Sequence, residues 1–98
     1  MTQVISTDTF VVAGQRVQIA GVRGGPTMVN GLKGWLNANG NALICRAAGA
    51  RYRCLTPNGK DVGLVVLENG AGETDASASV EYRSAENQAK AAHKGIWR

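Results

Sequence analysis

The fold is restricted most strongly by two pairs of β-type runs, each pair joined by a short turn that contains glycine. Residues 9–12 and 16–22 form the first pair, and residues 42–45 and 52–56 form the second around Gly49. The runs are rich in β-branched, aromatic and other apolar residues, and glycine can adopt the positive φ that a tight turn needs. Two antiparallel hairpins are therefore predicted.

Helical spacing of apolar residues occurs between and after these hairpins. Apolar side chains in residues 28–36 recur with a period near that of a helix, which predicts a short helix ending around residues 37–40. Gly31 and Gly34 weaken this helix. Residues 61–69 suit a second short helix, but a strand competes there because valine favours sheets.

The C-terminal residues carry the clearest helix signals. Residues 80–94 form a helical run, Ser77 or Ser79 can cap its start, and Gly95 stands where a glycine commonly ends a helix. Strands, a short helix, more strands and a final helix make an α+β order without the alternation of a parallel sheet. The 98 residues are enough for one compact core.

Charge is distributed unevenly along the chain. The formal net charge is +4, yet no acidic residue lies between Asp8 and Asp61, whereas acidic residues outnumber basic ones from Asp61 onward. The basic residues of the acid-free stretch are Arg16, Arg23, Lys33, Arg46, Arg51, Arg53 and Lys60. This distribution predicts a basic pole that would attract polyanions, although the same charge would also serve plain solubility. The sequence leaves both interpretations open.

Residues 82–97 carry the most specific motif of the chain. They contain a tyrosine followed by the pattern A-E-x-x-A-K-x-x-x-x-G-I-W, in which Tyr82, Glu86, Gly95 and Trp97 stand at defining positions. This motif resembles the closing helix of staphylococcal-nuclease-like domains. Weaker matches follow the order of that family at residues 8–9, 14–22, 58–62 and 66–72.

The resemblance implies a single domain over residues 1–98, built as a mainly β, α+β structure. Its expected form is a five-stranded OB-fold barrel with a short helix between strands, a short helix after the last strand and a C-terminal helix. The resemblance also favours a helix over a strand for residues 61–69. Tyr82 and Trp97 are then expected to serve the core or the docking of the final helix.

The nuclease chemistry of that family needs carboxylates for a metal ion, a general base and arginines for the phosphoryl oxygens. On the resemblance, Asp8 keeps one metal-binding position as a relic, Gln18 replaces a catalytic arginine and Arg23 replaces the second metal ligand. No acidic residue from position 9 to position 60 could supply that ligand or the base. We therefore expect no catalytic residue, no metal site, no calcium and no other cofactor.

Two further arginines leave the alignment open. Residues 50–53 resemble a shortened form of the loop that holds the second arginine of the family, but Arg53 can equally match a later strand position.

The single histidine, His93, stands in the last turn of the predicted helix, where a contact with the helix dipole explains it more simply than catalysis does. Two cysteines and one histidine are too few for a zinc site.

The two cysteines are predicted to face each other. If the second hairpin turns about residues 49–50, Cys45 lies directly opposite Cys54, close enough for a disulfide. A bridge would stabilise the domain by about 2–3 kcal/mol. Two buried thiols in a cytosolic protein remain the alternative.

A bridge would favour an exported or periplasmic location. Residues 1–3 show no signal-peptide pattern, and no stretch is long enough to insert into a membrane.

Three functions follow for such a chain. The first is a non-catalytic module that binds single-stranded DNA, RNA or another polyanion through phosphate contacts; its candidate residues are Arg16, Arg23, Arg46, Arg51, Arg53 and Lys60. The alternative is a protein-interaction or assembly domain, for example an accessory domain of a bacterial surface-polysaccharide or secretion system. An active calcium-dependent nuclease is disfavoured most, because the residues it needs are replaced.

Overall fold

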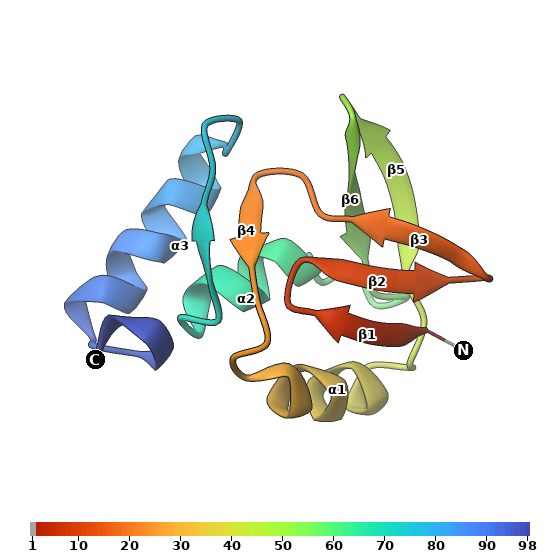
Figure 1. The fold of residues 1–98 in the computed structure, drawn as a ribbon, viewed down its shortest axis with the longest axis horizontal. Coiled ribbons are helices and arrows are strands. Elements are labelled where there is room, and N and C mark those ends of the chain that lie inside the picture. Colours follow the sequence, from red (N-terminus) through yellow and green to blue (C-terminus); the bar gives the residue numbers. More distant parts are fainter. Residues whose placement is uncertain (1) are drawn as a thin grey trace.

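The computed structural model describes residues 2–98. This part of the chain contains seven strands, three α-helices and a 3-10 turn (Figure 1). In chain order they are β1 (Gln3–Ser6), β2 (Thr9–Val12), β3 (Gln15–Gln18), β4 (Val22–Gly24), α1 (Val29–Ala38), β5 (Ile44–Ala48), β6 (Arg51–Leu55), α2 (Val62–Glu68), β7 (Gly72–Thr74), α3 (Val80–Ala91) and η1 (Gly95–Trp97).

The strands form three small sheets. β1, β2 and β3 make an antiparallel meander, β4 pairs with β7, and β5 pairs with β6. The meander meets the third sheet at a single parallel bridge, where the Ala20 amide donates to the Tyr52 carbonyl at 2.7 Å beside the pair Ile19 and Tyr52.

The predicted five-stranded OB-fold barrel is wrong: within residues 2–98 the three sheets stay separate and no closed barrel forms. The predicted strand over residues 16–22 divides into β3 and β4, which belong to different sheets. Gly21 lies at this break with φ of 80°, a conformation that interrupts an extended strand. Closure needs every strand to pair on both sides, and one bridge between β3 and β6 does not provide that.

The helices lie close to where apolar spacing places them. α1 begins at Val29 and ends at Ala38, as predicted. Residues 62–68 form a helix and not a strand, because the Asp61 carboxylate caps its start by accepting from the Gly63 amide at 2.9 Å. α3 begins after Ser79, whose hydroxyl accepts from the Tyr82 amide at 3.2 Å, so Ser79 and not Ser77 is the cap.

The end of α3 differs from the prediction. The helix stops at Ala91, and His93, with φ of 52°, occupies the position after the helix cap that was predicted for Gly95. Gly95 is also left-handed, with φ of 54°. The Lys94 amide donates to the Ala89 carbonyl at 3.0 Å, and the His93 amide donates to the Lys90 carbonyl at 3.1 Å, which is the Schellman pattern. His93 therefore serves the helix end through its backbone.

Gly95 has a different structural role. It packs backbone to backbone against Gly70, and a Cβ at either position would collide with the main chain of the other segment. The Ile96 amide donates to the Gly70 carbonyl at 2.9 Å. The 3-10 turn η1 is thereby fixed to the connection between α2 and β7.

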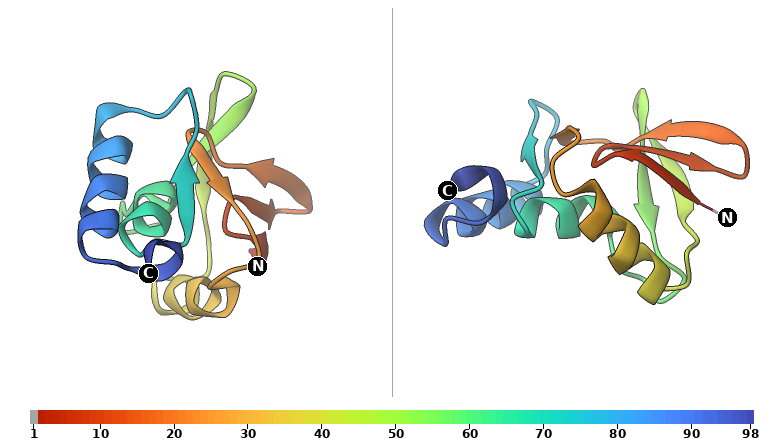
Figure 2. Two further views of the ribbon diagram at one scale, coloured as in Figure 1. Left: turned by 60° about the vertical axis from the view of Figure 1, so that its left-hand side comes forward. Right: turned by 60° about the horizontal axis from the view of Figure 1, so that its bottom comes forward.

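The core lies between the sheets and the helices. Its most deeply buried side chains come from all three sheets and from α1 and α2; they include Phe10, Ile19, Val22, Leu36, Cys54, Val62, Val66 and Leu67. α2 lies between α3 and the strands, while α1 lies beneath the meander (Figures 1 and 2). The turn of the β5–β6 hairpin projects from the body in every view.

Candidate functional site

Three of the predicted arginines share one face of the β5–β6 hairpin. Arg46 lies directly opposite Arg53 in the ladder, and Arg51 stands two residues before Arg53, opposite Ala48. Because side chains alternate between the faces of a strand, Arg46, Arg51 and Arg53 point away from the face that carries Cys45 and Cys54. We call these three side chains the arginine face.

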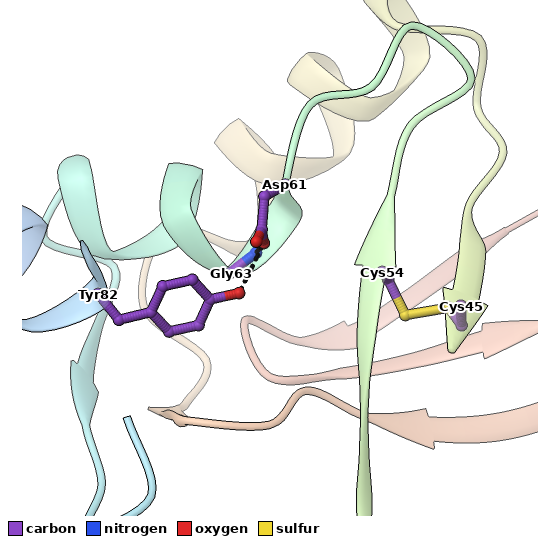
Figure 3. Close-up of a disulfide and its surroundings, with 5 residues drawn as sticks. All are labelled: Cys45, Cys54, Asp61, Gly63 and Tyr82. Atoms are coloured by element: carbon purple, nitrogen blue, oxygen red, sulfur yellow. Dashed lines mark hydrogen bonds between the residues drawn. A yellow bond between two sulfur atoms is a disulfide. The ribbon is translucent and has the colours of Figure 1, made fainter. Parts of the chain in front are cut away.

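The disulfide predicted from the hairpin is confirmed. Cys45 and Cys54 are paired in register, with an S–S distance of 2.01 Å and a Cα–Cα distance of 4.1 Å (Figure 3). They occupy the ladder position next to Arg46 and Arg53, on the opposite face. Like charges directly opposite each other weaken a ladder. The covalent link at the neighbouring position offsets this repulsion and keeps the two arginines side by side.

Arg53 is held in place by the cap of α2. Its Nε donates to Asp61 Oδ2 at 3.0 Å, and the other oxygen, Oδ1, accepts from the Tyr82 hydroxyl at 2.7 Å. This carboxylate is only 8% exposed, whereas the Arg53 side chain is 62% exposed. The hydrogen bond to Asp61 raises the pKa of Arg53. Burial, and then the bond to Asp61, raises the pKa of Tyr82 well above its ordinary value.

Figure 3 shows the Tyr82 ring directed from α3 toward Asp61 at the start of α2. Gly63 leaves the space that the ring needs, since a Cβ there would lie 2.5 Å from the Tyr82 hydroxyl oxygen. The burial of Tyr82 and this contact support the prediction from the resemblance that Tyr82 serves helix docking. The Nη atoms of Arg53 have no hydrogen-bond partner within residues 2–98 and are free for an anion.

The Arg51 side chain is less exposed than that of Arg53 and contacts two other segments. Its Nη1 donates to the Val22 carbonyl at 3.3 Å and lies 3.8 Å from Asp75 Oδ2. Hydrogen bonds from Ser77 hold the pKa of Asp75 below its ordinary value, so this carboxylate stays charged beside Arg51. Arg51 therefore joins the second sheet to the hairpin and has less freedom to bind a ligand.

The remaining predicted arginines and lysine are spread over the molecule. Arg23 lies on β4 opposite Glu73 and forms an exposed ion pair with it at 3.9 Å. Arg16 lies on β3, and Lys60 lies in the turn before α2. Within the described residues, Arg16, Arg46 and Lys60 have no carboxylate within ion-pair distance. Of the six candidates, only Arg46, Arg51 and Arg53 are gathered on one face.

The Asp8 carboxylate takes part in local hydrogen bonds. Its Oδ1 accepts from the Ser6 hydroxyl at 2.7 Å and from the Thr9 hydroxyl at 3.0 Å. Partial burial opposes ionisation, but the bonds from Ser6, from the Gly24 backbone and from Thr9 hold the pKa of Asp8 below its ordinary value. No group of three carboxylate, histidine or cysteine side chains occurs in the described part of the chain. These residues do not fit a calcium ion, which takes six or more oxygen ligands.

The other motif residues support the C-terminal helix. The Glu86 carboxylate accepts from the Thr74 amide at 2.7 Å and from the Thr74 hydroxyl at 2.9 Å, which fixes α3 to β7. Partial burial opposes ionisation of Glu86, yet these bonds from Thr74 hold its pKa below the ordinary value. The Lys90 ammonium lies 4.6 Å from the centre of the Trp97 ring. Trp97 thus packs beneath α3 through a cation–π contact.

Asp61 is the functional residue that sequence reasoning missed. The sequence marks it as the first acidic residue after the basic stretch and as the start of a predicted short helix. It gives no sign that Asp61 contacts Tyr82 and Arg53, which the structure shows. The local signal was present, because an aspartate after an Asn-Gly turn and before an apolar run is a helix cap. Its partners Arg53 and Tyr82 lie 8 and 21 residues away, beyond the reach of local patterns.

In the residues that the structure covers, no helix is long and apolar enough to cross a membrane. The sequence matches no family model and no curated protein.

Proposed function

We propose that this chain is a catalytically degenerate relative of staphylococcal-nuclease-like domains that binds single-stranded nucleic acid without cleaving it. The observation that supports the proposal is the pair formed by Arg46 and Arg53, side by side on an exposed hairpin. Guanidinium groups bind phosphate through two parallel hydrogen bonds, and a pair of them spans adjacent charges of a nucleic acid backbone.

The fixed geometry of Arg46 and Arg53 favours a role in ligand binding over a role in solubility alone. A surface arginine that serves solubility needs no fixed geometry, but Arg53 is anchored through Nε to a nearly buried carboxylate, Asp61. The disulfide beside Arg46 and Arg53 removes further freedom from the backbone. Groups that are already held in place lose less entropy when a ligand binds.

The residues near Asp8 support the part of the proposal that expects no cleavage. This carboxylate has Ser6 and Thr9 as hydrogen-bond partners, and Arg23 stands where the second metal ligand of the related nucleases is expected. Gln18, at the position of the expected arginine, is neutral and exposed on β3. Among residues 2–98, no group of three or more carboxylate, histidine or cysteine side chains could hold a cation.

A paired assay tests both halves of the proposal. Binding of a fluorescent dodecathymidylate and of a dodecauridylate is followed by anisotropy, and cleavage of the same probes is followed on gels with calcium present. We expect binding that weakens as salt rises, and cleavage no faster than with buffer alone. Cleavage that requires Asp8 would overturn the non-catalytic part, and failure to bind either probe at low salt would overturn the nucleic-acid part.

A further inference from the structure

Strand β5 has an open edge. It pairs with β6 on one side, and among residues 2–98 no strand pairs with its other side. Four of its five residues are exposed, which makes it more exposed than β6. The outer edge of the meander differs, because α1 packs against β1. Proteins commonly protect such an edge with charged side chains, a proline, a bulge or a covering segment. β5 has neither a proline nor a bulge, and its one charged side chain is Arg46.

The direction of the main-chain groups on this edge follows from the disulfide. A Cα–Cα distance of 4.1 Å between Cys45 and Cys54 is typical of a non-hydrogen-bonded pair, in which the amide and carbonyl of each residue point away from the partner strand. The amide and carbonyl of Ala47 point the same way, because the pattern repeats every two residues. None of these four groups has a hydrogen-bond partner in the described chain. The edge thus presents two donors and two acceptors.

The side chains along this edge define what could pair with it. Arg46 stands between Cys45 and Ala47 and has no carboxylate within ion-pair distance among residues 2–98. Ile44 lies two residues before it on the same face and is 60% exposed. A strand added in antiparallel fashion would bond to Cys45 and Ala47, and its residue opposite Arg46 would lie in a close, non-hydrogen-bonded pair. That position suits a carboxylate, and the position opposite Ile44 suits an apolar side chain.

We propose that the free edge of β5 binds an extended acidic segment of a partner protein by strand addition. The segment places a glutamate or aspartate opposite Arg46 and an apolar residue opposite Ile44. This site shares Arg46 with the proposed nucleic-acid face, but its main contacts are the backbone groups of Cys45 and Ala47, which that function does not use.

Charge favours an acidic partner over a second copy of this chain. Antiparallel pairing of two β5 strands would bring two hairpins together that each carry Arg46, Arg51 and Arg53, on chains with a net charge of +4. Like charges opposed across a ladder are destabilising, whereas a carboxylate opposite Arg46 is stabilising.

The test uses the peptide Thr-Val-Thr-Glu-Thr-Val-Thr with blocked ends, which reads the same in both strand directions. Binding to the oxidised protein is measured by titration of backbone amide NMR signals. Ala47→Pro removes the outward amide without removing a bond to β6, and Ala47→Val is the matched control that keeps the amide. We expect Ala47→Pro to weaken binding at least about tenfold and Ala47→Val to leave it within about twofold.

Two changes in the peptide leave the protein untouched, so they test the site even if Ala47→Pro fails to fold. The first change methylates the amide nitrogens of the two threonines next to glutamate, which are the donors that strand addition needs. The second replaces glutamate by lysine, which reverses the charge opposite Arg46. Each is expected to weaken binding at least about tenfold. Equal binding of the methylated peptide would overturn strand addition. Dimerisation of the peptide-free protein that Ala47→Pro abolishes would overturn the choice of an acidic partner over a second copy of this chain. Retained oligonucleotide binding by folded Ala47→Pro would separate this site from the nucleic-acid function.

Discussion

The Tyr82 hydroxyl donates a hydrogen bond of 2.7 Å to Oδ1 of Asp61, and this contact joins the C-terminal helix to the cap of α2. The second oxygen of the same carboxylate receives Arg53. One buried aspartate thus connects helix docking to the position of an arginine on the hairpin. The most specific sequence motif of the chain, which contains Tyr82, therefore bears on the candidate binding face through a single intermediate residue.

Tyr82→Phe is expected to lower the free energy of unfolding by about 1–2 kcal/mol. The substitution leaves the ring in the core but removes the donor to Asp61, a nearly buried acceptor that keeps its bonds to α2 and Arg53. Urea unfolding followed by circular dichroism measures the change. Tyr52→Phe is the control, since the Tyr52 hydroxyl makes no hydrogen bond within residues 2–98, and equal losses in both variants would contradict the role of the Tyr82 hydroxyl.

A pair of glycine substitutions tests the space beside the same ring. Gly63→Ala would place a Cβ 2.5 Å from the Tyr82 hydroxyl oxygen, so we expect a loss of about 1–3 kcal/mol. Gly34→Ala lies in α1 with no neighbouring heavy atom within 4 Å, and alanine there should stabilise the helix by about 0.5–1 kcal/mol. Thermal unfolding of the two variants should shift in opposite directions. A shift in the same direction would contradict the close packing of Gly63 against the Tyr82 ring.

The disulfide is expected to contribute about 2–3 kcal/mol to stability, as a bridge closing a loop of this length does. The double substitution of Cys45 and Cys54 by alanine should lower the urea midpoint accordingly. The same variant should bind oligonucleotide more weakly, because Arg46 and Arg53 lose the link that holds their strands together. Unchanged oligonucleotide affinity in a folded double variant would mean that the bridge does not position the two arginines.

Acid should weaken the attachment of α3 to β7. The pKa of Glu86 is held below its ordinary value of 4.5. The stabilisation that the ionised carboxylate gives to the fold is therefore fully present above pH 4.5 and is lost as pH falls through the folded-state pKa. Stability of the wild type should therefore decline below about pH 4.5, and Glu86→Gln should decline less steeply. Urea midpoints between about pH 6 and pH 3 measure this, with Glu81→Gln on the same helix as control. Identical slopes for wild type and Glu86→Gln would refute the assignment.

Local patterns were sufficient for part of this fold. The register that joins Cys45 to Cys54 follows from a two-residue turn and a period of two, both of which lie within twelve residues of sequence. The cap and start of α3 follow from Ser79 in the same way. These features depend on neighbours along the chain, which is why spacing predicts them.

Long-range features were not accessible in this way. The break at Gly21 separates β3 from β4, and this glycine also packs against the Tyr82 ring, 61 positions further along the numbering. Strand β7, with three residues, is too short for a periodic signal. For the site, the basic stretch was visible in the sequence, but its partial neutralisation by Asp61 and Asp75 depends on tertiary contacts. The predicted barrel was therefore wrong, and the sequence could not show which of the six candidate cations are paired with carboxylates.

The salt dependence of oligonucleotide binding tests the central claim most directly. Affinity for dodecathymidylate is measured by anisotropy across a salt series for the wild type, for the double variant Arg46→Gln/Arg53→Gln, and for Lys33→Gln on α1 as control. Each phosphate contact on a single strand contributes about 0.7 to the slope of log affinity against log salt. The double variant should lower the slope by about 1.4, with Lys33→Gln close to wild type. An unchanged slope in a folded double variant would contradict the assignment of the arginine face as the binding site.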